Sequence, residues 1–119
     1  MAAIVAAEPA FEVEFVAVRR WPASALGPGV VWLEPDPAAP FVRLTREVWG
    51  GFPACPPYGR ADDELEAHLT IAIDDPTRFD GAEDEAARFL PIRRATGSVS
   101  LLVQGSDGRY RTRRRFRLG

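Results

Sequence analysis

The sequence predicts an α+β fold with mainly antiparallel sheets and packed helices. Three observations predict it. Residues Phe11–Val18 alternate between apolar and acidic side chains, as a half-buried strand does. The segments 41–52 and 80–91 carry helical spacing or helix-start signals. The dipeptide Asp107-Gly108 separates two strand-like segments and signals a β-hairpin. Hairpin-connected strands mixed with single helices are typical of the α+β class.

The first half of the chain is expected to begin with the last turns of a helix, because Pro9 follows an alanine-rich apolar run. Strands are then expected at Phe11–Val18 and Val30–Pro35, followed by a helix at 41–52. In that helix Phe41, Leu44 and Val48 recur at helical spacing, and two consecutive glycines end the pattern.

The second half opens with a predicted irregular loop at 53–64 and continues with a strand at 68–73. The segment 80–91 is expected to hold a short helix, with Asp80 as its N-cap and Pro91 just beyond its last residue. Two closing strands at 97–104 and 109–119 flank the turn. The predicted order is therefore (α)ββαβαββ.

Composition predicts one domain over residues 1–119, with 46% hydrophobic and 27% charged residues. With a net charge of -2, the chain as a whole is not a polycation of the kind that binds nucleic acid by charge alone. From Arg93 onward, however, it contains eight arginines and one acidic residue. Cys55 stands alone, so no disulfide or cysteine metal site is expected and a buried thiol is favoured. The short apolar run at the start is a poor signal peptide and too short for a membrane span, so we expect a cytoplasmic protein without membrane attachment.

The chain's single histidine, His68, lies two residues before Thr70 in the predicted strand. Strand side chains alternate, so both should share one accessible face while Leu69 and Ile71 face the core. An imidazole can transfer a proton near neutral pH, and a neighbouring hydroxyl can hold a phosphate oxygen. The alternative is a histidine without chemistry beside a threonine favoured by strand propensity.

The motif "HLTIA", preceded by "PPYG" and followed by a helix and a hairpin ending in "FRLG", resembles the 2H phosphoesterase superfamily. The resemblance is strongest to the bacterial 2′-5′ RNA ligase-like branch and covers Phe11–Gly119. It implies a bilobal α+β fold with two His-x-Thr motifs facing a groove. It also implies RNA-end chemistry on a 2′,3′-cyclic phosphate, leaving a 2′-phosphate, with no metal and no cofactor.

The resemblance assigns roles to matching positions. His68 would be one of two general acid–base histidines and Thr70 would hold the phosphate. Tyr58 matches the aromatic that precedes the motif strand in relatives, where it would stack on a base; packing of the proline-rich loop is the alternative. The acidic residues Asp62, Asp63, Glu64 and Glu66 could supply a carboxylate that orients the imidazole, or could form a solvated run.

This chain departs from the family pattern because no second histidine exists. We therefore expect most of the bilobal fold with its first strand and first motif missing. A homodimer through the incomplete N-terminal side would bring two copies of His68 together. Two alternatives remain open: a catalytically inactive module that binds nucleotides or RNA ends, and a small structural or interaction protein.

Alternation in the last strand predicts four arginines on one face: Arg111, Arg113, Arg115 and Arg117. Such a row could track phosphates or could keep an exposed strand soluble. Arg114 falls on the opposite face, where it is a candidate for substrate binding or for a pair with Glu12 or Glu14. The tryptophans, including Trp21 and Trp32, are expected in the core or at its boundary.

Overall fold

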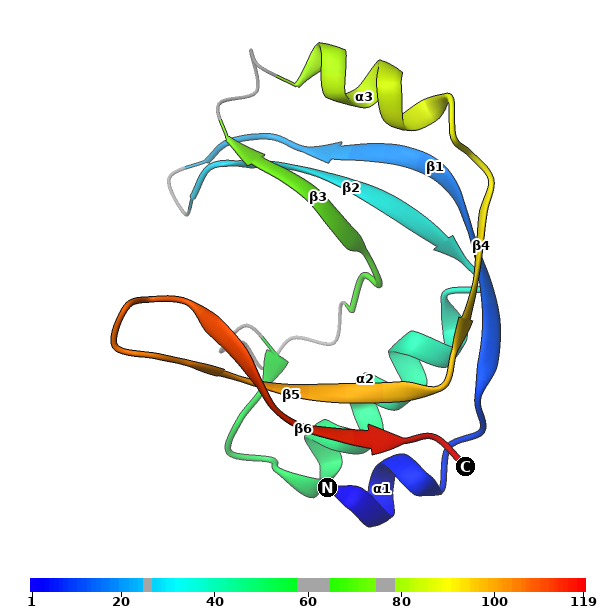
Figure 1. The fold of residues 1–119 in the computed structure, drawn as a ribbon, viewed down its shortest axis with the longest axis vertical. Coiled ribbons are helices and arrows are strands. Elements are labelled where there is room, and N and C mark those ends of the chain that lie inside the picture. The colour runs from blue at the N-terminus through cyan, green and yellow to red at the C-terminus, as the bar shows by residue number, and fades with distance from the viewer. Residues whose placement is uncertain (25–26, 58–64, 75–78) are drawn as a thin grey trace. The chain divides into compact units, whose positions relative to one another are not determined.

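The computed structural model describes residues 1–24, 27–57, 65–74 and 79–119 (Figure 1). The elements in these residues are α1 (Ala2–Ala6), β1 (Phe11–Trp21), β2 (Gly29–Asp36), α2 (Ala39–Gly51), β3 (Leu69–Asp74), α3 (Asp80–Ala87), β4 (Ile92–Thr96), β5 (Ser98–Gln104) and β6 (Tyr110–Arg117). The pairs β1–β2, β2–β3 and β5–β6 are all antiparallel. The α+β class with mainly antiparallel sheets is confirmed.

Two details of the predicted elements were wrong. Strand β4 was not expected, because Arg93 and Arg94 interrupt any apolar alternation and only the two ends of the strand are half-buried. Asp80 is not the N-cap of α3: Phe79 takes that position without a capping side chain, and Asp80 lies in the first turn. There the carboxylate of Asp80 accepts a hydrogen bond from Arg20 at 2.9 Å.

The chain divides into two compact units, which are described separately. Unit 1 comprises Met1–Glu12, Pro40–Glu64 and Ala95–Gly119, and unit 2 comprises Val13–Ala39 and Leu65–Arg94. The sheet with strand order β3-β2-β1-β4 belongs mainly to unit 2, and the β5–β6 hairpin belongs to unit 1.

In unit 2, helix α3 lies along one side of the sheet (Figure 1). Val31, Leu33 and Phe79 are buried, with Phe79 only 1% exposed. Arg20 lies opposite Val31 and reaches α3, where it donates to Glu83 at 2.6 Å and its guanidinium lies 5.5 Å from the Phe79 ring centre. The hydrogen bonds to Glu83 and then Asp80 raise the pKa of Arg20, so the helix is held by apolar burial and by a charged clamp.

In unit 1, helix α1 lies against β6 (Figure 1). Val5, Phe116 and Leu118 form the buried core, and Leu44 and Val99 are among the half-buried side chains around it. Full burial of side chains of this size stabilises the fold by about 1.5–3 kcal/mol each. A small apolar core therefore fixes the hairpin onto α1 and α2.

Two bulges redirect the predicted alternation. The register of β1 shifts between Phe15 and Ala17. Beyond this bulge, Val18 and Arg20 lie on the same face of the strand as Val13 and Phe15. The register of β6 shifts opposite Leu101/Leu102. A single-residue bulge exchanges the two faces for every side chain beyond it.

The row of four arginines predicted on β6 is therefore wrong. Arg115 and Arg117 share a face, Arg113 is the extra residue in the bulge, and Arg111 lies on the opposite face, paired with Val103. No helix among the described residues is long and apolar enough to span a membrane.

Candidate functional site

The candidate site of unit 2 lies at the start of β3. Thr70 pairs with Trp32 of β2, and Leu69 pairs with Leu33. The register then shifts, so that Val31 lies opposite Ala72 and Ile71 is the extra residue. Thr70 therefore shares the face of Trp32.

That face is the one away from α3. Val31 and its partner Arg20 lie on the α3 side, because Arg20 bonds to the acidic residues of that helix. Trp32 follows Val31 in the strand and points to the other side, as alternation requires. Trp21 pairs with Val30 and so belongs to the same side as Trp32.

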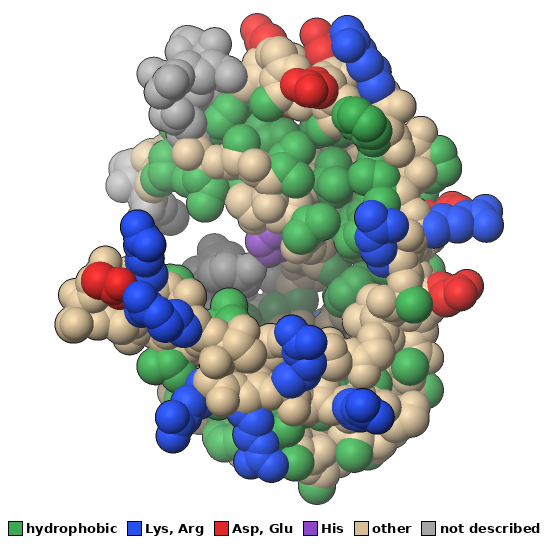
Figure 2. All heavy atoms as spheres, viewed as in Figure 1, with side chains coloured by type: hydrophobic (Ala, Val, Ile, Leu, Met, Phe, Trp, Pro, Cys, Tyr) green, Lys and Arg blue, Asp and Glu red, His purple; other side chains and the backbone are tan. Residues whose placement is uncertain are grey.

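His68 immediately precedes β3 and packs against both tryptophans. Its ring centre lies 4.7 Å from that of Trp21 and 6.1 Å from that of Trp32, in both cases edge-on. The two indole rings are themselves 4.9 Å apart. The histidine, purple in Figure 2, is half-buried, whereas Thr70 is exposed. The predicted placement of His68 and Thr70 on one face agrees with this geometry.

A main-chain hydrogen bond sets the orientation of the imidazole. Nδ1 of His68 lies 2.7 Å from the carbonyl oxygen of Glu66. A carbonyl only accepts, so Nδ1 carries the hydrogen in this bond. In the neutral ring the lone pair is then on Nε2.

The apolar residues of β3 do not form the expected core face. Leu69 is 46% exposed and Ile71 is 41% exposed. By contrast, Leu33 and Val31 on the same face of β2 are 4% and 0% exposed. Strand β3 is the edge strand of this sheet, so its side chains have neighbours on one flank only.

The two tryptophans are the site residues that sequence reasoning missed. Trp32 is 5% exposed, as a core residue should be, and its indole Nε1 has no hydrogen-bond partner within the described part of the chain. Its ring packing against Trp21 and His68 therefore holds it in place. The missing signal was the strand register, because nothing local in the sequence places Trp21 and Trp32 beside His68.

The remaining predicted residues lie elsewhere or are not described. Tyr58 lies outside the described residues, as do Asp62, Asp63 and Glu64 of the acidic run. Glu66 contributes its carbonyl oxygen to His68 rather than a carboxylate. Cys55 is exposed, so its expected burial was wrong.

Arg114 of unit 1 stacks on an aromatic ring. Its guanidinium lies 5.0 Å from the ring centre of Phe116. Within unit 2, the carboxylate of Glu14 accepts a hydrogen bond from Arg93. Among the described residues, no three side chains of His, Cys, Asp or Glu are grouped so as to hold a metal ion.

The antiparallel α+β fold is consistent with the class of 2H phosphoesterases, and the family comparison supports that class. The model of the 2′-5′ RNA ligase superfamily matches residues 1–108. The chain therefore belongs to the 2′-5′ RNA ligase superfamily. A comparison with curated proteins gave no match.

Proposed function

We propose that this phosphoesterase acts on RNA ends that carry a 2′,3′-cyclic phosphate, with His68 as a proton-transfer group and Thr70 as the phosphate anchor. One observation supports this most strongly. His68 is oriented by the Glu66 carbonyl and two indole rings, beside the exposed hydroxyl of Thr70. In this orientation Nε2, rather than Nδ1, is the ring nitrogen that we expect to transfer the proton.

The proposed reaction is hydrolysis of the cyclic ester. Water attacks phosphorus and loses a proton, the bond between phosphorus and the 3′-oxygen breaks, and that oxygen gains a proton. The products are a 2′-phosphate and a 3′-hydroxyl. Nε2 of His68 carries out one of these two proton transfers, and each such transfer contributes roughly 10²–10⁴ in rate.

Thr70 would donate its hydroxyl hydrogen to a non-bridging phosphate oxygen. Within the described residues this hydroxyl has no hydrogen-bond partner, so a ligand could engage it without breaking a protein contact. Thr70→Val preserves the branched shape and removes the donor, whereas Thr70→Ser keeps the donor. We expect phosphate binding to weaken in the first variant and to persist in the second.

Two further residues are proposed to contact the RNA. Tyr58 would stack on a base, as the family resemblance implies. Arg114, exposed and stacked on Phe116, would bind a phosphate group. Substitution of either residue should raise KM more than it lowers kcat.

A second proton-transfer group is needed for the other half of the reaction. The chain has one histidine, so we propose that a second copy supplies the other imidazole. The rate would then rise with more than the first power of protein concentration below the dimerisation constant. A strictly linear dependence over that range would contradict the two-copy mechanism.

The direct test is turnover of an RNA oligonucleotide with a 2′,3′-cyclic phosphate by the wild-type chain and by His68→Ala, with products resolved by chromatography. Formation of a 2′-phosphate that is lost in the variant supports the proposal. Equal turnover by both proteins would overturn the role of His68.

A second candidate function is binding of RNA ends without turnover, and the single histidine favours it. In that case the wild-type chain would bind the cyclic end with no product formed. Thr70→Val would weaken this binding, and the matched oligonucleotide with a 3′-hydroxyl would bind less tightly.

A further inference from the structure

One face of the β5–β6 hairpin is exposed along its whole length. The register places eight side chains on it: Ser98, Ser100, Leu102 and Gln104 from β5, and Tyr110, Thr112, Arg115 and Arg117 from β6. All eight are exposed, with Tyr110 at 64%. We call this set the hairpin face.

The charges on the hairpin face are not neutralised within the hairpin. Arg115 lies opposite Ser100 and Arg117 lies opposite Ser98. Neither arginine forms an ion pair with any described residue, and the hairpin face itself contains no acidic side chain. Two guanidinium groups therefore stand next to hydroxyl donors on an exposed surface.

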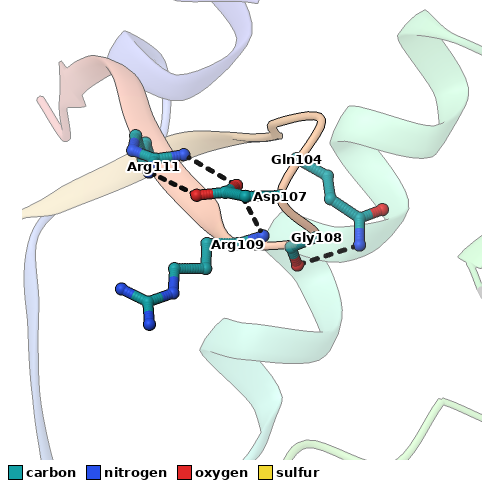
Figure 3. Close-up of polar contacts among 5 residues, drawn as sticks. All are labelled: Gln104, Asp107, Gly108, Arg109 and Arg111. Carbon is teal, nitrogen blue, oxygen red and sulfur yellow. Dashed lines mark hydrogen bonds and ion pairs between the residues drawn. The ribbon is translucent and has the colours of Figure 1, made fainter.

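The one acid in this part of the chain is occupied elsewhere. Asp107 accepts hydrogen bonds from Arg111 at 2.7 and 3.1 Å and from the Arg109 amide at 3.1 Å (Figure 3). These contacts, that with Arg111 first, lower the pKa of Asp107. In Figure 2 basic side chains are spread over the region of β5 and β6, with an acidic one near the turn. Asp107 therefore compensates Arg111 and leaves the hairpin face basic.

The opposite face of the hairpin is the one that contacts the core of unit 1. Val99 and Phe116 point to that other side and pack with Val5 of α1. Leu101 and Val103 on that side are 40% and 50% exposed, so Val99 and Phe116 are the hairpin residues that pack into the core of unit 1. The expected alternative, that a basic strand only resists aggregation, accounts for arginines but not for the exposed aromatic ring.

We propose that the hairpin face binds the sugar-phosphate backbone of single-stranded RNA and that this binding does not require a reactive end. The Cα atoms of residues two apart on a strand are separated by about 6.7 Å, and the long arginine side chains extend from this spacing to reach successive phosphates. Arginine can bind each phosphate with two hydrogen bonds, the serines add hydroxyl donors, and Tyr110 offers a ring on which a base can stack.

The composition favours RNA over a lipid surface. Leu102 is the single aliphatic side chain on the hairpin face, so there is little apolar area to insert between lipids. Stacking on Tyr110 also requires unpaired bases, which a single strand supplies. The surface lies apart from His68 in the sequence and involves none of the site residues of unit 2, so it extends beyond the proposed function.

The test is fluorescence anisotropy with a labelled 12-nucleotide oligouridine that ends in a 3′-hydroxyl and so contains no reactive phosphate. R115Q/R117Q is compared with R46Q/R88Q, which removes the same charge from exposed arginines on α2 and just after α3. Loss of two contacts should lower the salt slope by about 1.4 and weaken binding about 25-fold at 0.1 M salt. The control pair should bind within about twofold of the wild-type chain.

A second comparison addresses stacking. Tyr110→Ser should weaken binding by about 5-fold or more, whereas Tyr110→Phe should bind as the wild-type chain does. Equal losses in the two arginine double variants would overturn the proposal, as would equal binding by both Tyr110 variants. Tighter binding to anionic vesicles than to the oligouridine, lost in R115Q/R117Q, would also overturn it. Because this RNA cannot be turned over, the result is independent of whether the chain hydrolyses cyclic phosphates.

Discussion

The face of β3 that carries Thr70 and the hairpin face, the two surfaces proposed to act on RNA, are built in opposite ways. At the start of β3, one half-buried imidazole is held by aromatic rings and a main-chain carbonyl. On the hairpin face, guanidinium, hydroxyl and phenol groups are exposed and are not fixed by ion pairs within the described residues. A site that transfers protons needs fixed geometry, whereas a surface that follows a flexible polyanion needs charge and reach.

A β-bulge occurs in each of the strands that carry these two faces. A bulge in β3 places Ile71 outside the register just after Thr70, and a bulge in β6 does the same with Arg113. In β3 the bulge comes after both His68 and Thr70, so the alternation that puts them on one side is not interrupted. In β6 it separates Arg111 from Arg115 and Arg117. Position relative to a bulge therefore decides which side chains share a face.

The largest expected effect is loss of activity in His68→Ala. Removing the proton-transfer group should lower kcat/KM for a 2′,3′-cyclic phosphate substrate by about 10²–10⁴. Binding of the unreactive oligouridine should not change, because the hairpin face is intact. A variant that loses both properties would show that the two faces are not separable, and circular dichroism would establish whether the fold had been lost.

Next in size is the effect of Phe79→Ala on stability. Phe79 is 1% exposed beneath the sheet that carries His68, so its truncation should lower the free energy of unfolding by about 3–5 kcal/mol. Phe52 is 45% exposed and provides the matched control, for which we expect a loss below about 1 kcal/mol. Urea denaturation measures both, and similar losses would show that Phe79 does not anchor α3.

A smaller effect is expected from Trp21→Ala. The edge-on contact with His68 restricts the imidazole, and aromatic pairs of this kind contribute about 0.5–1.5 kcal/mol. This corresponds to a fall in kcat of about 2- to 13-fold with little change in KM. Trp21→Phe should recover most of the rate. A change confined to KM would instead assign Trp21 to substrate binding.

The smallest effect concerns the hairpin turn and depends on pH. Because the folded-state pKa of Asp107 is lowered below its ordinary value of 3.8, its carboxylate stabilises the fold above about pH 4. That contribution is lost as pH falls through the lowered pKa. Asp107→Asn should therefore reduce Tm slightly at pH 7 and not at pH 2. An equal reduction at both pH values would exclude the ion pair with Arg111 as its cause.

Local patterns predicted most of the fold. Alternation in Phe11–Val18 and the Asp107-Gly108 turn both marked elements that the structure contains. Strand β4 was missed because two arginines hide its alternation, and the capping residue of α3 was misassigned because Asp80 bonds across to Arg20 instead. Such contacts are tertiary and leave no local signature.

The candidate site was also predictable only where a local pattern places its residues. His68 and Thr70 follow from a period of two along a single strand. Trp21 and Trp32 join them only through the pairing of three strands, and the separation of Arg111 from Arg115 follows only from a bulge. Sequence alone shows which side chains alternate, but pairing decides which of them meet.

The proposed role of His68 requires that the Glu66 carbonyl accepts the Nδ1–H and so leaves Nε2 as the atom for proton transfer. Since the chain has one histidine, two-bond ¹H–¹⁵N correlation NMR reports on this imidazole without ambiguity. We predict that the neutral ring carries its hydrogen on Nδ1, and that the Nε2 signal moves on addition of a 2′,3′-cyclic nucleotide. A neutral ring protonated on Nε2, with signals unaffected by the nucleotide, would contradict the account.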